Sequence, residues 1–210
     1  MTAPRPPIGF RFDVPDHWTV LDLDPAGAPG WVDGFLALHA VDLPGSEWSR
    51  AGDLLRLMIE QHQQAGVLFA AVLGNRAATA DGLVAAGLAL AWQELAGMDL
   101  AELEEFCRQD VPGPGEELAA REVCRLRLRH GDAIRVRSRQ SAPVPMTSMR
   151  RPVAIVQHLV LVPGSGWLGV FSLTTPQVDR AQEYADLADR VARSLVLVND
   201  SGEPLSGHVA

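Results

Sequence analysis

The segment VAIVQHLVLVPGSGWLGVFSLTTP, residues 153–176, holds two apolar stretches separated by a short turn sequence. Pro163-Gly164-Ser165-Gly166 is typical of a turn, so the stretches are predicted to be adjacent antiparallel strands. Residues 153–162 are apolar on both faces, which predicts a central strand covered on both sides. Thr175-Pro176 then predicts the start of an amphipathic helix. Its predicted apolar face is Ala181, Tyr184, Ala188, Val191 and Leu195.

The preceding segment, REVCRLRLRHGDAIRVRSRQS at residues 121–141, predicts a β-hairpin. A loop of His130-Gly131-Asp132 would pair Leu128 with Ile134, which separates apolar from charged side chains. A slip of one residue would mix them on each face, so the odd-length loop is the favoured register. It places six arginines on one face, and these are the candidate partner-binding residues: Arg125, Arg127, Arg129, Arg135, Arg137 and Arg139.

The N-terminal part is predicted to combine strands with one long helix. Alternating residues 8–14 and 18–23 predict a hairpin, and residues 33–41 predict another strand. Ser46 is a suitable N-cap for a helix over 47–65, which Gly66 would end. Residues 67–73 and 83–94 predict two apolar strands. Asp99 and Glu102 resemble a capping box for a short helix with Leu100, Leu103 and Phe106 on its apolar face.

Length and composition favour one α+β domain, with an antiparallel β-sheet flanked by helices. The chain has 210 residues, of which 47% are hydrophobic. We expect a flexible lead-in over 1–7, a single domain over 8–198 and a flexible tail over 199–210. Neither a transmembrane run nor a secretory signal is apparent, so a cytoplasmic location is expected. Cys107 and Cys124 lack CxxC spacing and are expected to be free thiols.

Charge is unevenly distributed along the chain. The formal net charge is −8, and all basic residues are arginine, as is common in GC-rich bacterial genomes. Residues 121–151 carry nine arginines and two acids, a net of +7, whereas the remainder carries −15. The acidic total argues against nucleic acid as a partner, but it conceals a basic surface.

The residues give no support to catalysis, and we expect neither an enzyme nor a bound cofactor. The six histidines show none of the spacings typical of metal sites, so no metal is expected. Gly164-Ser165-Gly166 is not a nucleophile elbow, and no phosphate-binding loop is present. An enzyme would need a cleft in which His62 or His158 meets a carboxylate or a cysteine.

Three interpretations of the arginine surface stay open. It is an exposed face balanced by the acidic segment 99–117, a docking surface for an acidic protein or a second copy, or a surface for nucleic acid or anionic lipid. Guanidinium groups favour carboxylate partners, and the absence of interleaved aromatic residues disfavours nucleic acid. No membrane partner is expected.

The chain is similar to the PsbP-like α/β/α sandwich family, which includes a photosystem extrinsic subunit, a Ran-binding import factor and bacterial relatives. The resemblance rests on FRFDVPDHW at 10–18, on LVLVPGSGWLGVFSLTTPQ at 159–177 and on the helix through Ser194-Leu195. It implies an actinobacterial-type accessory or scaffold module rather than an enzyme, and it brings no catalytic residues. The expected function is protein interaction through the arginine hairpin. The alternative is a small-ligand-binding domain, with a pocket lined by Trp48, Trp92 or Trp167.

Overall fold

The computed structural model describes residues 8–40, 42–75, 79–95, 97–109, 120–129, 131–144, 147–162, 165–199 and 201–204. The fold is α+β and is built on a seven-stranded sheet whose paired strands are all antiparallel. This confirms the predicted fold class. In spatial order the strands are β2 (Thr19–Val20), β3 (Val67–Gly74), β4 (Val84–Glu94), β8 (Trp167–Thr175), β7 (Arg150–Val162), β6 (Gly131–Pro143) and β5 (Ala120–Leu128).

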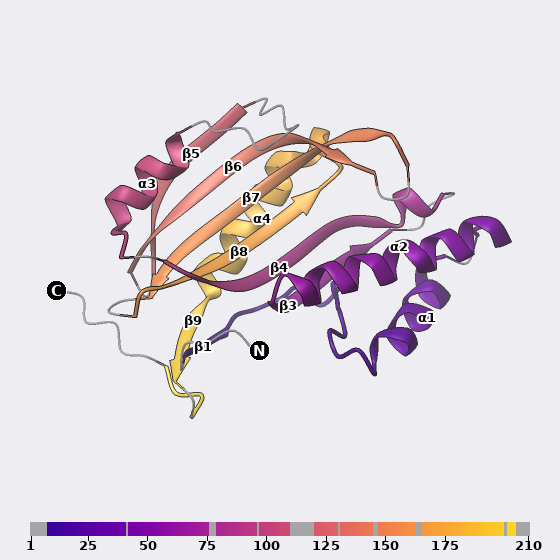
Figure 1. The fold of residues 1–210 in the computed structure, drawn as a ribbon, viewed down its shortest axis with the longest axis horizontal. Coiled ribbons are helices and arrows are strands. Elements are labelled where there is room, and N and C mark those ends of the chain that lie inside the picture. The colour runs from indigo at the N-terminus through magenta and orange to yellow at the C-terminus, as the bar shows by residue number, and fades with distance from the viewer. Residues whose placement is uncertain are drawn as a thin grey trace.

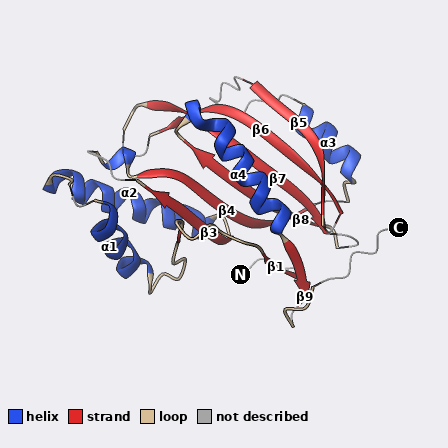
Figure 2. Ribbon diagram, turned by 180° about the vertical axis from the view of Figure 1, so that it is seen from behind, coloured by secondary structure: helices blue, strands red, loops and turns tan. Residues whose placement is uncertain are grey.

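Helices cover both faces of this sheet. Helix α4 (Ala181–Ser194) crosses one face diagonally (Figure 2). The opposite face carries α1 (Ala28–His39) and α2 (Gly45–Gln64) near β3 and β4, and α3 (Leu100–Arg108) near β5 and β6 (Figure 1). We call these the α4 face and the α2/α3 face. Two short 3₁₀ helices, η1 (Ala80–Gly82) and η2 (Val178–Arg180), precede β4 and α4.

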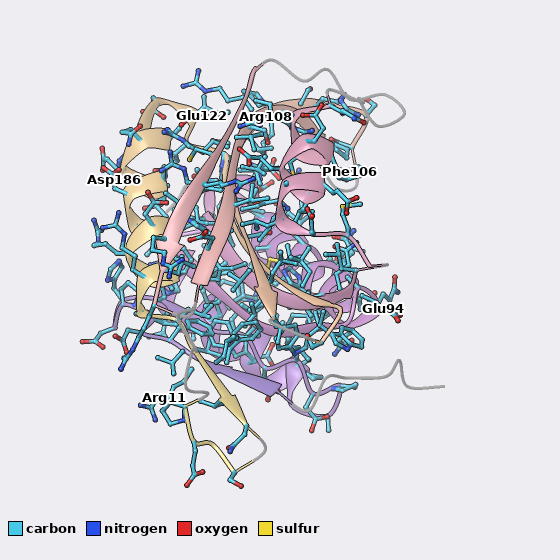
Figure 3. The ribbon with its side chains drawn as sticks, turned by 90° about the vertical axis from the view of Figure 1, so that its left-hand side faces the viewer. Arg11, Glu94, Phe106, Arg108, Glu122 and Asp186 are labelled. Atoms are coloured by element: carbon cyan, nitrogen blue, oxygen red, sulfur yellow. The ribbon has the colours of Figure 1, made fainter. Side chains whose placement is uncertain are left out.

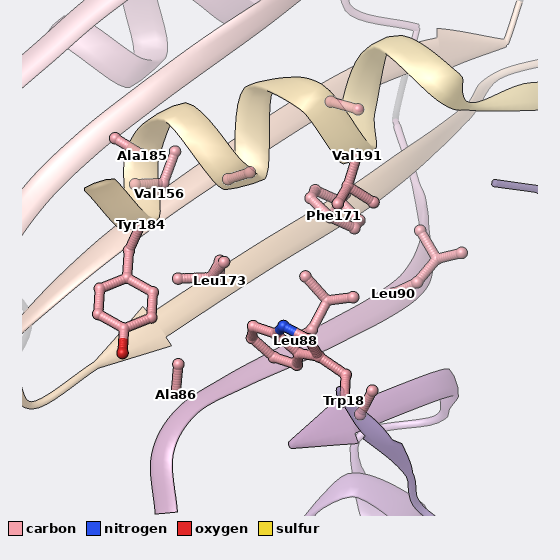
Figure 4. Close-up of a cluster of buried hydrophobic side chains, with 13 residues drawn as sticks. Trp18, Ala86, Leu88, Leu90, Val156, Phe171, Leu173, Tyr184, Ala185 and Val191 are labelled. Atoms are coloured by element: carbon pink, nitrogen blue, oxygen red, sulfur yellow. The ribbon is translucent and has the colours of Figure 1, made fainter. Parts of the chain in front are cut away.

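The core beneath α4 follows directly from the alternation of the strands. Leu88 pairs with Leu173 and Leu90 with Phe171, so these large side chains point together toward the helix (Figure 4). Tyr184 and the small residues of α4 close over them, which confirms the predicted apolar face of this helix. Burial of such side chains contributes about 25 cal/mol per Å² of apolar surface.

Two separate cores lie on the α2/α3 face. Val32, Phe35 and Leu36 of α1 pack with the buried side of α2 against β3. At the other end of the sheet, Leu103 and Cys107 of α3 pack on β6 and β7. Because α2 and α3 cover opposite ends of this face, the middle of the sheet lies between them.

The long helix, the central strands and the capping box are confirmed. Helix α2 ends just before Gly66, which has a left-handed φ of 67°. Asp99 accepts hydrogen bonds from the backbone of Ala101 and Glu102, and the Glu102 side chain accepts from the Asp99 backbone, as a capping box requires.

Several local predictions are wrong. Residues 33–41 were expected to form a strand, but α1 covers 28–39, because Val32, Phe35 and Leu36 recur at helical spacing. The N-cap of α2 is Pro44 rather than Ser46, and η2 intervenes between Pro176 and α4. On α3 the predicted apolar residue Phe106 is 61% exposed, and Cys107 is buried instead.

The predicted N-terminal hairpin is also wrong. β1 (Ile8–Arg11) pairs with β9 (Val196–Asn199), and β2 pairs with β3. Together β1 and β9 form a second, two-stranded sheet, which joins the two ends of the described chain. The predicted lead-in 1–7, acidic residues 110–117, Val41, His130 and the tail beyond 204 lie outside the described residues. No described helix is long and apolar enough to cross a membrane.

Aromatic packing fixes β1 against the main sheet. The rings of Phe10 and Trp92 stack with centroids 4.3 Å apart. Gly169 of β8 makes this possible, because a Cβ atom at that position would lie 2.4 Å from the Phe10 ring. Gly87 on the neighbouring strand β4 differs, since a Cβ there would meet nothing within 4 Å.

These two strand glycines give a matched test of packing. We expect Gly169→Ala to lower the free energy of unfolding by about 1–3 kcal/mol, because the methyl group displaces Phe10. Gly87→Ala should raise it by up to about 1 kcal/mol, because alanine loses less entropy in a strand. Urea denaturation of both variants measures the difference, and equal effects would contradict the assignment of Gly169 as a packing glycine.

Candidate functional site

The arginine hairpin has a different register from the predicted one. β5 and β6 pair Leu128 with Gly131 and Arg125 with Ile134. Arg125 and Arg127 therefore share the α2/α3 face with Ile134, whereas Arg135, Arg137 and Arg139 lie on the α4 face. The expectation of six arginines on one face is wrong. It assumed one buried and one solvated face, but this hairpin lies between α3 and α4 (Figure 3).

On the α2/α3 face, Arg125 belongs to an ion-pair cluster with α3. Glu104 of α3 lies between the guanidinium groups of Arg125 and Arg108 and accepts a hydrogen bond from each. The hydrogen bond from Arg125 is the main reason why the pKa of the Glu104 carboxyl is lowered. Arg121 donates to the carbonyls of Cys107 and Gln109, at 3.0 and 3.2 Å, near the C-terminus of the same helix.

On the α4 face, Arg135 joins a more buried network. Its guanidinium donates to Asp189 Oδ2 of α4 at 2.7 Å, and His158 Nε2 lies 2.8 Å from Asp189 Oδ1. Because a carboxylate only accepts, Nε2 carries the proton of this hydrogen bond. Burial alone would raise the pKa of Asp189, but the hydrogen bond from His158 and the charge of Arg135 outweigh it, so the pKa is lowered.

This arrangement makes His158 a core residue. Its side chain is completely buried, and Nδ1 has no hydrogen-bond partner among the described residues. His158 does meet a carboxylate, but it lines neither of the two cavities described below. The network instead ties β6 and β7 to α4.

The remaining hairpin arginines make fewer contacts with the helices. Arg127 pairs with Asp132 across the strands at 2.8 Å, and Arg137 donates to Gln182 of α4 at 2.8 Å. Arg129 and Arg139 are exposed, and neither forms a hydrogen bond or ion pair with another described residue. Most of the predicted surface is thus engaged within the chain.

The main cavity of the molecule lies elsewhere, between α2 and the α2/α3 face of the sheet. Its volume is about 390 Å³, within the range of small-molecule sites. One wall is the side of α2 that faces away from α1, and the other is the end of the β6–β7 hairpin. Lining residues include Leu54, Leu57, Met58, Gln61 and His62 of α2, Gly87 and Ala89 of β4, Ser172 and Thr174 of β8, and Pro143, Val144, Arg151 and Val153.

Small side chains explain why this space is open. Along β4, the α4 face carries Leu88 and Leu90, whereas the α2/α3 face carries Gly87 and Ala89. Gly87 pairs with Thr174 and Ala89 pairs with Ser172, so adjacent strands both present short side chains. These four residues form the floor of the cavity, and their side chains are too short to fill the space beneath α2.

The helix above this floor is more apolar than its packing requires. Ala51, Leu55 and Ile59 are buried against α1 and β3, but Leu54, Leu57 and Met58 are only half-buried and line the cavity. His62 also lines it, and its Nδ1 donates to the Met58 carbonyl at 2.6 Å. The apolar stripe of α2 therefore continues past the protein core into the cavity.

The tryptophans expected to line a pocket do not line this one. Trp92 stacks on Phe10 at the α4 face, and Trp167 packs near it. Trp48 is 37% exposed on α2, outside the cavity. The expectation of a pocket between sheet and helices is met, but its lining was assigned wrongly. Alternation of small and large residues over 84–92 is the sequence signal that indicates the floor.

A second cavity of about 310 Å³ lies beside the start of α4. Arg137 and Arg139 line it together with Glu122 and Asp179. Because both signs of charge are present, its lining selects no class of ligand. Within the described ranges, no group of three or more His, Cys, Asp or Glu side chains could hold a metal ion. Cys107 and Cys124 are free thiols, as expected.

Comparison with known proteins supports the fold alone. No protein-family model matches the chain, and no curated protein matches it. Among solved structures, it is similar to the crystal structure of LpqN, described as involved in cell envelope biogenesis of Mycobacterium tuberculosis. The TM-score is 0.50 and the identity 12%, over 90% of this chain and 83% of LpqN.

Replacing Asp189 tests the network beneath α4. We expect Asp189→Asn to lower the free energy of unfolding at neutral pH by about 2 kcal/mol, because it leaves the largely buried Arg135 with only the exposed carboxylate of Glu122, 3.0 Å away, as its charge partner. The difference from wild type should shrink as pH falls below the ordinary aspartate pKa of about 3.9, because the unfolded chain then takes up a proton that the folded carboxylate, with its lowered pKa, does not. It should disappear once pH falls below the lowered pKa of the folded carboxylate. Denaturant unfolding from pH 7 to pH 2 measures this.

Asp186→Asn on the same helix is the control. Asp186 is exposed and accepts one hydrogen bond from Gln182. Its loss should change stability by less than about 0.5 kcal/mol. A similar decrease in the free energy of unfolding in both variants would show that the Asp189 network contributes no more to stability than an exposed hydrogen bond.

Proposed function

We propose that this protein is a non-enzymatic binding module that holds an apolar small molecule in the cavity beneath α2. The observation that carries the proposal is an open cavity of about 390 Å³ with half-buried leucine and methionine side chains above a floor of glycine and alanine. Such surface is costly to leave in water, and a ligand that covers it gains the corresponding hydrophobic free energy.

The glycine in this floor strengthens the proposal. A glycine inside a strand costs stability relative to alanine, and Gly87 needs neither a positive φ nor a close contact. Nothing in the described protein therefore requires it. Its effect is to keep the cavity deep, which suits a ligand.

We also propose that the chain is a PsbP-like accessory module. The order of strands and helices and the helices on both faces support this assignment. LpqN, with a similar fold, is described as involved in cell envelope biogenesis, a role that a binder of apolar molecules would suit. The non-enzymatic assignment is supported by both candidate histidines: His158 is buried with Asp189, and His62, which lines the cavity, donates its hydrogen bond to the Met58 carbonyl and not to a carboxylate.

Filling the cavity from its floor tests the proposed binding. We expect the neutral apolar fluorophore N-phenyl-1-naphthylamine to bind wild type with enhanced fluorescence, and Gly87→Phe to weaken that binding at least tenfold. The phenyl ring would occupy the ligand's space, and thermal stability should be unchanged or higher because the added Cβ meets open space.

Gln93→Phe is the matched control. Gln93 is exposed on the same face of β4, outside the cavity, so this variant adds the same ring elsewhere. It should bind the fluorophore like wild type. Equal fluorescence of both variants and wild type, or no binding by wild type, would refute the cavity as the binding site.

A second candidate function is docking of an acidic protein through the exposed part of the arginine hairpin. It is favoured by Arg129 and Arg139, which have no partner among the described residues. We expect Arg129→Ala combined with Arg139→Ala to weaken the salt-sensitive binding of such a partner without lowering the stability of the protein. Arg125→Ala with Arg135→Ala should instead lower the melting temperature, because these arginines hold α3 and α4. A partner from the native host that is retained by both double variants would refute docking here.

A further inference from the structure

We infer that the ligand of this cavity is a single-chain anionic amphiphile whose charged head binds Arg151. The inference rests on the proposed function and specifies its ligand class. The head is a carboxylate or phosphate, since both accept hydrogen bonds from the planar guanidinium group.

Arg151 is the one arginine among the described residues that line this cavity, whose surface is mostly apolar but also includes His62 and Asp81. It follows Arg150 at the start of β7 and points to the α2/α3 face, as Val153 does two residues later. One terminal nitrogen donates to the backbone carbonyl of Asp81 in η1 at 3.0 Å. Within the described part of the chain, no residue accepts a hydrogen bond from its other nitrogens. The guanidinium group is thus held in place by one hydrogen bond, and its other N–H groups are available to a ligand.

The nearby carboxylates of Asp81 and Glu47 already accept hydrogen bonds from other groups. Asp81 receives two hydrogen bonds from Arg50, at 2.9 and 3.0 Å. Glu47 accepts the backbone N–H of Ala80 at 2.8 Å and lies 3.7 Å from Arg50. No carboxylate of a described residue comes within 4 Å of the Arg151 side chain. An acidic ligand head would supply that missing charge.

The dimensions of the cavity favour one short chain. Beyond the buried Ala51, the lining residues of α2 extend from Leu54 to His62, about 12 Å at a rise of about 1.5 Å per residue, which is roughly the length of a ten-carbon chain. Leu57 and Met58 cover this length from above, and Gly87 lies below. A volume of about 390 Å³ has no room for the two acyl chains of a phospholipid.

Competition among ligands of one chain length tests the head group. Decanoate, decyl phosphate, decan-1-ol and decyltrimethylammonium, each below its micelle concentration, would displace N-phenyl-1-naphthylamine from wild type. We expect one or both anions to bind at least tenfold more tightly than the alcohol, and the cation to bind most weakly. The two anions together identify which head is preferred. Octanoate should bind roughly 15-fold more weakly than decanoate, at about 0.8 kcal/mol per methylene.

Variants of Arg151 then assign the charge to one residue. Arg151→Gln should reduce the affinity for the preferred anion about tenfold and leave the alcohol unchanged. Arg151→Glu should reverse the order, so that decyltrimethylammonium binds more tightly than either anion. Arg150→Gln is the control, because it removes the same charge from the adjacent, exposed arginine, which bonds to Ser141 outside the cavity.

The outcomes separate the two proposals. Binding of the fluorophore that Gly87→Phe blocks would support the apolar binding site. If anion and alcohol then compete equally, or if Arg150→Gln acts like Arg151→Gln, the anionic ligand is refuted and the apolar binding site stands. If wild type does not bind the fluorophore, the proposed function itself fails. Reversal of charge preference in Arg151→Glu, with normal thermal stability, would establish the head-group site.

Discussion

Burial of the main sheet on both faces is the constraint on which most of this structure depends. A sheet covered on both faces leaves little solvated surface for charged side chains, so Arg125 and Arg135 of the β5–β6 hairpin need acids on the helices that cover them. Glu104 of α3 serves one face and Asp189 of α4 the other. The same ion pairs fix the positions of both helices, and α3 therefore stays at one end of its face. The middle of that face is left for a cavity.

The cavity arises from a mismatch between α2 and the strands below it. Helix α2 presents an apolar stripe wide enough to contact both α1 and the sheet, but the sheet has only short side chains at that position. Leu54, Leu57 and Met58 remain half-buried as a result. A protein selected only for stability would fill this space with one larger residue at Gly87. The unfilled space is the feature on which the proposed ligand site rests.

Local sequence patterns predicted many of the helices and strands, but they did not predict the pairing between strands distant in sequence. The strands at 153–174, helix α2 and the capping box of α3 follow from periodicity and capping residues within a short window. The hairpin register failed because alternation of leucine and arginine indicates a solvated face only when no second helix covers it. The site was half predicted: a pocket between sheet and helices was expected, but Gly87 and Arg151 come together only through the β4–β8–β7 pairing, which no local window contains.

The pairing of β1 with β9 has a consequence for how the chain is made. These strands begin and end the described fold, so β1 has no partner until β9 has left the ribosome. Phe10, which packs over Gly169 and Trp92, stays without its support during that time. Contacts between such distant residues close slowly. The fold therefore cannot be completed before β9 is available, and the nascent β1 strand is the segment most in need of protection from premature association.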